Sequence, residues 1–444
     1  MARTAGLGTH ITVTFLRQGL GLVLGLALAA LVARTLGPDG QGKYALAVLL
    51  VTLVLTIFNL GVPAANVYFL GRGEVSVAAV LRTNVRISLL LGAAGGMAGA
   101  FVIFFLADSW FPGVPEPLLW IALVGFPFAL LQSFFVSLLQ GLQDFNRYNL
   151  VLLVQPFLAL ALTALAVLVF DWGIAGALAA YVVSLAIDLG VAWYACRRHL
   201  RATEPRTAGA PSDRYAARCV AYGWKALIGG NLAFFSYRSG HLLLNYFINP
   251  ASTGVYAVAV AIAEKIWMLS LAVSSVLLPR LSELHTDEAK RRRLTPLATR
   301  TVFAASCVVA IVLFAGARPL IVYLFGAVYE EAVGALRWLL PGVLMLAVAK
   351  GVGNDLAARG RVDINLGVAA AVVAVSIVLN VVLIPRYGVD GAAMAATFSY
   401  GLNMIIGLVI YRRITGNRWY TLMVFQRRDF EMLRGKLESL KRTR

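Results

Sequence analysis

The chain alternates long apolar runs with short polar breaks, and each run is long enough to cross a membrane as a helix. A bilayer core of about 30 Å needs about 20 apolar residues in a helix, and only a helix satisfies its own backbone groups in lipid. Twelve such runs occur in the sequence, so we predict an all-α integral membrane protein with twelve transmembrane helices. The predicted spans, with boundaries good to a few residues, are about 11–33, 44–70, 83–106, 117–140, 149–170, 173–195, 225–248, 254–278, 300–325, 333–357, 364–384 and 389–411.

Basic residues are concentrated in alternate connections between these spans. The long connections 196–218 and 279–299 are rich in Arg and Lys, whereas "ADSWFPGVPEP" and "GAVYEEA" carry acids and no base. Because basic connections stay on the cytoplasmic side, we predict that both termini are cytoplasmic. The location that follows is the inner (cytoplasmic) cell membrane, crossed many times.

Composition narrows the class of function. Apolar residues make up 60% of the chain and the formal net charge is +18. The positive charge lies mostly in the connections, so it signals topology and not a nucleic-acid partner. The three cysteines have no CxxC spacing, and the chain has no GxxxxGK[ST] phosphate loop. We therefore expect no metal, no cofactor and no hydrolysis of ATP by this chain.

Short motifs recur at a nearly constant offset. "LGPDGQGKYALAV" at 36–48 matches "INPASTGVYAVAV" at 248–260, with Pro38 aligned to Pro250 and Gly42 to Gly254. Two further matches, "GLQDFN" with "GRVDIN" and "GIAGALAA" with "GVDGAAMA", keep the same order. An even number of spans in each half makes the halves parallel repeats. We predict six-helix bundles at 1–200 and 219–412, a basic linker at 201–218 and a basic amphipathic tail at 413–444.

Several of these stretches resemble a known family. "ARTLGPDGQGKYALAV", "VLLPRLSEL" and "NVVLIPRYGVDGAAMAATFSY" are similar to polysaccharide transporters of the multidrug/oligosaccharidyl-lipid/polysaccharide (MOP) exporter superfamily, which includes the O-antigen (Wzx-type) flippases. The resemblance covers about residues 10–412. It implies a V-shaped, MATE-like pair of bundles around a central cavity. It also implies a flippase, not an enzyme, that moves a polyprenyl-pyrophosphate-linked oligosaccharide from the inner to the outer leaflet by alternating access.

The seventh span carries a polar stripe. Its members fall at spacings of seven, three and four, which places them on one helical face: Asn231, Arg238, His241 and Asn245. The first span has an arginine on a similar face, Arg17, and lipid II flippases of the superfamily likewise have cavity arginines in that helix. Polar groups in such stripes usually face a cavity or a partner, so we expect this face to line the cavity.

Three cations in the spans are candidates to hold the pyrophosphate through charge-assisted hydrogen bonds: Arg17, Arg238 and Lys265. Structural roles remain open for two of them. Arg17 can extend to the headgroups of the inner leaflet, and Lys265 can pair with Glu264 or another acid.

Two acids in the spans, Glu264 and Asp188, are candidates to bind a coupling proton or sodium ion. A charge pair with Lys265 or Arg238 that holds helices in register explains them equally well. Asn59 shares a face of the second span with Asn66 and is a candidate for the polar lining, although helix packing is again an alternative.

Other functions and partners follow from the same residues. A multidrug or cation extruder of the same fold and a lipid II-type flippase are the alternatives to the saccharide flippase. A membrane enzyme is disfavoured because every predicted outer connection has about eleven residues or fewer. Expected partners are the lipid-linked saccharide, membrane lipids, a coupling ion and polysaccharide-assembly proteins; the amphipathic tail fits the anionic inner leaflet or a cytoplasmic protein.

Overall fold

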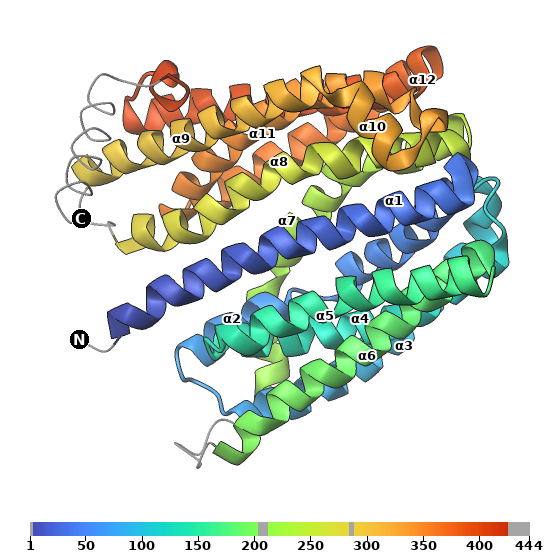
Figure 1. Cartoon of the computed structure of the whole chain (residues 1–444). Coiled ribbons are helices and arrows are strands. Elements are labelled where there is room, and N and C mark those ends of the chain that lie inside the picture. The colour runs from blue at the N-terminus through green and yellow to red at the C-terminus, as the bar shows by residue number, and fades with distance from the viewer. Residues whose placement is uncertain (1–2, 203–211, 284–287, 425–444) are drawn as a thin grey trace, which may run out of the picture. The chain divides into compact units, whose positions relative to one another are not determined.

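The computed structural model describes residues 3–202, 212–283 and 288–424, and the side chains within 17–200, 215–266 and 294–424 together with Arg292. The described residues form helices and short connections, with no strand among them (Figure 1). The elements are α1 (Arg3–Phe58), α2 (Val62–Gly71), α3 (Val77–Trp110), α4 (Glu116–Gly141), α5 (Phe145–Ala164), a π-helical turn η1 (Leu165–Val169), α6 (Gly173–Ala202), α7 (Ser212–Phe247), α8 (Pro250–Glu283), α9 (Glu288–Ala315), α10 (Ala317–Phe325), a 3₁₀ turn η2 (Ala327–Tyr329), α11 (Ala332–Ala358), α12 (Val362–Thr415) and a 3₁₀ turn η3 (Trp419–Leu422).

Eight helical stretches among the described residues are long and apolar enough to cross a membrane: Arg17–Phe58, Val77–Trp110, Glu116–Gly141, Phe145–Val169, Gly173–Leu200, Leu294–Ala315, Ala332–Ala358 and Val362–Thr415. Their outward faces are apolar as well. On α3, the side chains of Leu89, Leu90, Phe104 and Phe105 are 64–73% exposed. A continuous apolar face of this kind is stable in lipid and not in water. The prediction of an all-α, multi-pass membrane protein is confirmed.

The longest helix, α1, contains the first predicted span and part of the second, and the next longest, α12, contains the last two predicted spans. A straight helix of 56 residues, the length of α1, would extend about 84 Å at 1.5 Å per residue. That is far more than a bilayer core. Both helices break at a glycine with positive φ, Gly37 (φ 68°) in α1 and Gly388 (φ 56°) in α12. Such backbone favours glycine because it lacks a Cβ. The count of twelve spans and the side of the membrane on which the termini lie remain predictions.

Side-chain caps mark where several helices begin. The Ser76 hydroxyl accepts a hydrogen bond from the backbone N–H of Ala79 at the start of α3 (3.3 Å), and the Asp144 carboxylate does the same for Arg147 at the start of α5 (3.2 Å). The Asn249 side chain accepts from the N–H of Ser252 at the start of α8 (2.8 Å). These caps satisfy backbone donors that a helix leaves open at its first turn.

The chain forms two compact units. The first contains Met1–Val258 and Val322–Glu331, and the second contains Ala259–Ile321 and Ala332–Arg444. This division does not follow the predicted sequence halves, since α7 packs on α2 and α3 within the first unit. The predicted six-helix halves therefore stay a prediction. Most of the predicted linker (203–211) and the end of the predicted tail (425–444) lie outside the described residues.

Each unit has its own packed interior. In the first unit α4 packs between α3 and α6, which run beside it in Figure 1, and it buries Phe126, Phe134 and Leu138 completely. In the second unit α11 packs against α12 and α9. The polar groups described next lie on the helices of these two units, and they range from fully buried to exposed.

Candidate functional site

The predicted polar stripe lies on α7, in the first unit, and two of its members are deeply buried. His241 is 6% exposed and Asn245 is 1% exposed, whereas Asn231 and Arg238 are half-buried. Nδ1 of His241 and both amide atoms of Asn245 have no hydrogen-bond partner among the described groups. A buried polar atom without a partner is costly. Two members of the stripe therefore carry buried polar atoms whose hydrogen-bonding capacity the described groups do not fill.

Arg238 and His241 are neighbours on this face. They lie one turn apart on α7, close enough to interact electrostatically. The His241 ring also meets the Tyr256 ring of α8 edge-on, with centroids 4.9 Å apart. Asn231 instead donates to the carbonyl of Leu227 in its own helix (2.9 Å). The stripe thus combines a cation and an aromatic contact near Arg238 with Asn231, whose amide is hydrogen-bonded within its own helix.

Arg17 lies halfway along α1 before its break and is half-buried. It is close enough to Tyr148 of α5 to interact with it electrostatically, and its Nε has no hydrogen-bond partner among the described groups. The described neighbours of Arg17 and Arg238 thus differ. Whether both bind one anion stays a prediction.

Lys265 and Glu264 lie on α8 in the second unit, and both are half-buried. Glu264 is within electrostatic range of Lys350 on α11. The sequence could not predict that Lys350 lies near Glu264, because no spacing rule relates residues on different helices. The pair gives Glu264 a counter-charge other than Lys265.

Asp188 lies near the middle of α6 and is fully buried. Its Oδ2 accepts a hydrogen bond from Nε2 of Gln132 on α4 (2.8 Å). Its Oδ1 has no hydrogen-bond partner among the described groups. Gln132 was not singled out in the sequence, and its contact with Asp188 depends on the packing of α4 against α6.

Asn59 and Asn66 fall in different settings. The chain breaks between α1 and α2 at Leu60 and Gly61, both with positive φ. The Asn59 amide donates to the carbonyls of Leu55 and Thr56, and its oxygen accepts from the N–H of Gly61 (2.8 Å). Asn59 therefore stabilises this break, and its predicted place in a polar lining stays a proposal.

Asn66 is the centre of a buried network that joins four helices of the first unit. Its oxygen accepts from the Tyr215 hydroxyl of α7 (2.9 Å), and its amide donates to the Ser137 hydroxyl of α4 (2.9 Å) and to Asn84 of α3 (3.3 Å). Beside it Arg218 pairs with Glu74 (2.5 Å), and the Tyr222 and Tyr68 rings stack with centroids 4.4 Å apart. These contacts fasten the first third of α7 to α2 and α3.

Backbones approach one another very closely at Gly61 and at Gly42 in the first unit. A Cβ added to Gly61 would lie 2.1 Å from the carbonyl oxygen of Gly223 on α7. A Cβ on Gly42 would lie 1.8 Å from the Pro250 oxygen, and one on Gly254 would lie 2.0 Å from the Pro38 oxygen. The second contact joins the two copies of the repeated motif, residue for equivalent residue.

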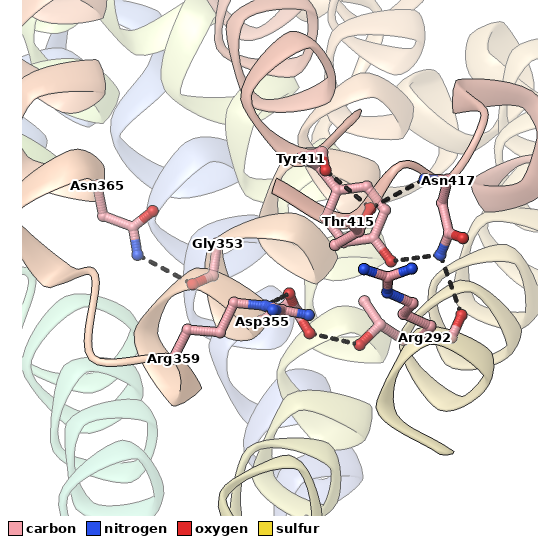
Figure 2. A network of polar contacts seen from close by, with 9 residues as sticks. Arg292, Gly353, Asp355, Arg359, Asn365, Tyr411, Thr415 and Asn417 are labelled. Carbon is pink, nitrogen blue, oxygen red and sulfur yellow. Dashed lines mark hydrogen bonds and ion pairs between the residues drawn. The ribbon is translucent and has the colours of Figure 1, made fainter. Parts of the chain in front are cut away.

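A further polar network joins the ends of α9, α11 and α12 in the second unit (Figure 2). Asp355, fully buried on α11, pairs with Arg359 (2.6 Å) and accepts from the Thr295 hydroxyl of α9 (2.8 Å). Asn417, just after α12, donates to the carbonyl of Arg292 on α9 (3.1 Å). The pair and its partners are satisfied, so we interpret the network as a clamp between helix ends.

The cysteines offer no metal site in the part of the chain that the structure describes. Cys196 and Cys219 are buried free thiols, Cys307 is half-buried, and no group of three acidic, His or Cys residues is found there. Burial raises the pKa of Cys219, beside Tyr215, to about 11. The thiol is therefore protonated near neutral pH and is a poor metal ligand.

These features define a class: a multi-pass helical membrane protein with buried, incompletely paired polar groups inside its helical units. The family described as polysaccharide biosynthesis protein matches residues 5–285, more than half of the chain. The chain belongs to this family, as the sequence motifs indicated. The family described as lipid II flippase MurJ matches residues 241–430.

Two curated relatives are similar over part of their length. The chain is 25% identical over 176 residues to the capsular polysaccharide biosynthesis protein CapF of Staphylococcus aureus, covering 39% of this chain and 44% of CapF. It is 29% identical over 199 residues to the probable flippase AglR of Haloferax volcanii, covering 42% of this chain and 40% of AglR. The chain thus matches less than half the length of these relatives.

Solved structures show the same fold. An inward closed conformation of the lipid II flippase MurJ has a TM-score of 0.72 and 13% identity, with 90% of this chain and 89% of that chain covered. An inward-facing multidrug resistance MATE family transporter of the MOP superfamily has a TM-score of 0.70 and 16% identity, covering 91% and 98%. These likenesses confirm the predicted MATE-like fold.

Proposed function

We propose that this protein is a flippase that moves a polyprenyl-pyrophosphate-linked oligosaccharide from the inner to the outer leaflet of the cytoplasmic membrane. Membership of the polysaccharide biosynthesis protein family supports a lipid-linked saccharide as substrate. The observation that carries the proposal is the buried polar face of α7, with Arg238 beside His241, in a chain that has the fold of a lipid II flippase. Alternating access, driven by an ion gradient, is the proposed mechanism.

Three cations are proposed to bind the pyrophosphate: Arg17, Arg238 and Lys265. Arginine forms paired, charge-assisted hydrogen bonds with phosphate oxygens, and these are stronger away from water. The proposed polar contacts to the saccharide come from Asn59, Asn231, His241 and Asn245. The two unpaired amide atoms of Asn245 support such a role, because a sugar hydroxyl can both donate and accept.

Two other functions are testable alternatives. The match of residues 241–430 to the lipid II flippase family favours lipid II as the substrate. A multidrug or cation extruder is the other alternative, and the likeness to a multidrug resistance transporter supports it in fold alone. Proposed partners beyond the substrate are the coupling ion and polysaccharide-assembly proteins of the membrane.

The test uses the full chain in lipid vesicles that contain a fluorescent polyprenyl-pyrophosphate-linked oligosaccharide. Flipping is measured as protection of the saccharide from a reagent that cannot cross the membrane. Arg238→Ala removes a charged hydrogen bond of about 1.5–3 kcal/mol, so we expect flipping to slow about 10- to 150-fold. Arg238→Lys keeps the charge and is expected to fall between Arg238→Ala and the unchanged protein.

Arg386→Ala is the matched control, because Arg386 is exposed on α12. Normal flipping by Arg238→Ala at equal protein level would remove Arg238 from the site. Faster flipping of lipid II than of other lipid-linked saccharides would identify a lipid II flippase. Drug efflux without any flipping would identify a drug extruder.

A further inference from the structure

Asp188 is a buried carboxyl group of the first unit that has no counter-charge beside it among the described side chains. Asp188 lies near the middle of α6, on a stretch that is long and apolar enough to cross a membrane. The side chain is 0% exposed, and its one hydrogen bond comes from Gln132 to Oδ2. Oδ1 accepts from no described group. One of the two carboxyl oxygens is thus buried without a hydrogen-bond partner among the described groups.

None of the charged side chains described on the surrounding helices pairs with Asp188. On α1, Arg17 interacts with Tyr148, and Lys43 pairs with Asp39. On α5, Arg147 pairs with Asp144. No hydrogen bond or ion pair joins Asp188 to any of the other charged or titratable side chains described on α1, α3, α4, α5 and α6: Arg34, Tyr44, Arg82, Arg86, Asp108, Glu116, Tyr181, Tyr194, Cys196, Arg197, Arg198 and His199.

An ionised carboxylate in this setting is strongly disfavoured. Burial removes its hydration, and no nearby positive charge among the described side chains compensates for the loss. The neutral acid needs only an acceptor for its O–H. Gln132 can supply one, because a glutamine amide presents either its NH₂ or its oxygen to a neighbour. The same contact of 2.8 Å therefore suits both the ionised and the protonated carboxyl group.

A metal cation is a poorer occupant of this position. Hard cations take several oxygen ligands at once. Gln132 is the polar partner seen on Asp188, and no cluster of three acidic, His or Cys residues occurs in the described part of the chain. One carboxyl and one amide suffice for a proton and not for a metal ion.

We propose that Asp188, hydrogen-bonded to Gln132, binds a proton reversibly within the membrane. One O–H bond forms on the carboxylate when the proton arrives from water, and the same bond breaks when the proton leaves to water. That this proton drives transport rests on the flippase function proposed above; its binding does not. Glu264 differs from Asp188 in having Lys350 within electrostatic range, and its predicted role in ion coupling stays a prediction.

The first experiment observes the proton directly. Infrared difference spectra of the full chain in lipid nanodiscs are recorded while the buffer pH is stepped. We expect a C=O band of a protonated carboxyl group that titrates in the unchanged protein and is absent from Asp188→Asn. The matched control is Asp108→Asn, which changes an exposed acid on α3 and should keep the band. Identical spectra for the unchanged protein and Asp188→Asn would overturn the proposal.

Gln132→Met provides a second variant that keeps Asp188 in place. Loss of the amide should shift the frequency of the band, whereas an unshifted band would overturn the pairing with Gln132. Replacing choline by sodium at constant ionic strength should leave both the band and the unfolding temperature unchanged. Stabilisation by sodium that disappears in Asp188→Asn would identify a metal site instead and overturn proton binding.

A flipping assay separates this inference from the proposed function. In vesicles with a proton gradient, we expect Asp188→Asn to lose the acceleration that the gradient gives the unchanged protein. An Asp188→Asn protein that is still accelerated would overturn the coupling role. If the unchanged protein flips no saccharide lipid, the proposed function fails while the infrared titration still decides whether Asp188 binds a proton.

Discussion

Asp144 connects the end of α4 to the neighbouring helices α5 and α6. Its carboxylate caps α5, pairs with Arg147 (2.8 Å) and contacts Nε2 of His199 (2.9 Å). Burial raises the pKa of Asp144, but the hydrogen bonds from Arg147 and His199 and their charges outweigh burial and hold it below the ordinary value. The ionised form is therefore the one that the folded protein stabilises.

This pKa predicts how stability depends on pH. Because folding lowers the pKa of Asp144, the stabilisation is fully present above the ordinary carboxyl pKa and is lost as pH falls through the lowered value. We expect Asp144→Asn, which keeps a capping side chain, to cost about 1 kcal/mol at neutral pH, and Asp144→Ala to cost about 1 kcal/mol more. Unfolding temperatures of the purified protein measure both differences. A deficit in Asp144→Asn that stays constant into strongly acidic buffer would contradict this prediction.

At the residue scale, the sequence identifies polar groups but not their partners. The stripe of Arg238, His241 and Asn245 could be predicted because helical spacing alone puts its members on one face. Gln132, Lys350 and Tyr215 could not, because each meets its partner across a contact between helices distant in the chain. Such contacts depend on packing angles that no local pattern contains.

The crossing of α7 with the break between α1 and α2 depends on two glycines. Gly223 and Gly61 bring carbonyl groups to distances that leave no room for a Cβ on either residue. Replacing Gly223 must therefore push α7 away from α2, and the Tyr222–Tyr68 stack and the Tyr215–Asn66 hydrogen bond should weaken together.

We predict that Gly223→Ala speeds hydrogen exchange of backbone amides in α2 and in the first third of α7. Each loss of about 1.4 kcal/mol in local stability corresponds to about tenfold faster exchange, and overpacking of this kind costs about 1–3 kcal/mol. Gly230→Ala is the control, because Gly230 lies on the same helix with open space around it. Equal exchange in the two variants would mean that the crossing does not hold α7 in place.

At the element scale, the apolar runs predicted α4 and α11 to within a residue at each end, whereas α7 and α9 begin well before their predicted spans and the predicted span 300–325 is divided between α9 and α10. The breaks at Gly37 and Gly388 fall between predicted spans, as connections should. The π-helical turn at Leu165–Val169 could not be predicted, because it interrupts an apolar run without any change in residue type. The split of the second predicted span at Leu60 and Gly61 was signalled only by Pro63 two residues further on.

For the molecule as a whole, the contact between the two copies of the repeated motif is the feature that sequence and structure share. Gly42 and Gly254 are equivalent positions of the motif, and each faces the carbonyl oxygen of the proline in the other copy. We predict that Gly42→Val lowers stability by about 3 kcal/mol or more, since backbone must move to admit the side chain. Gly21→Ala, on the same helix with open space around it, should leave the unfolding temperature unchanged or slightly raised. An unfolding temperature for Gly42→Val equal to that of Gly21→Ala would contradict the close contact.

The Gly42–Gly254 contact also has a consequence for genetics. A backbone carbonyl oxygen leaves no room for a side chain at Gly42 or at Gly254, and every amino acid has such an oxygen. A selection for suppressors of Gly42→Val should therefore recover reversion at the same codon or distant changes that shift a whole helix. It should never recover a compensating residue at Pro250 or Gly254, so these two sites are expected to resist variation independently rather than to covary.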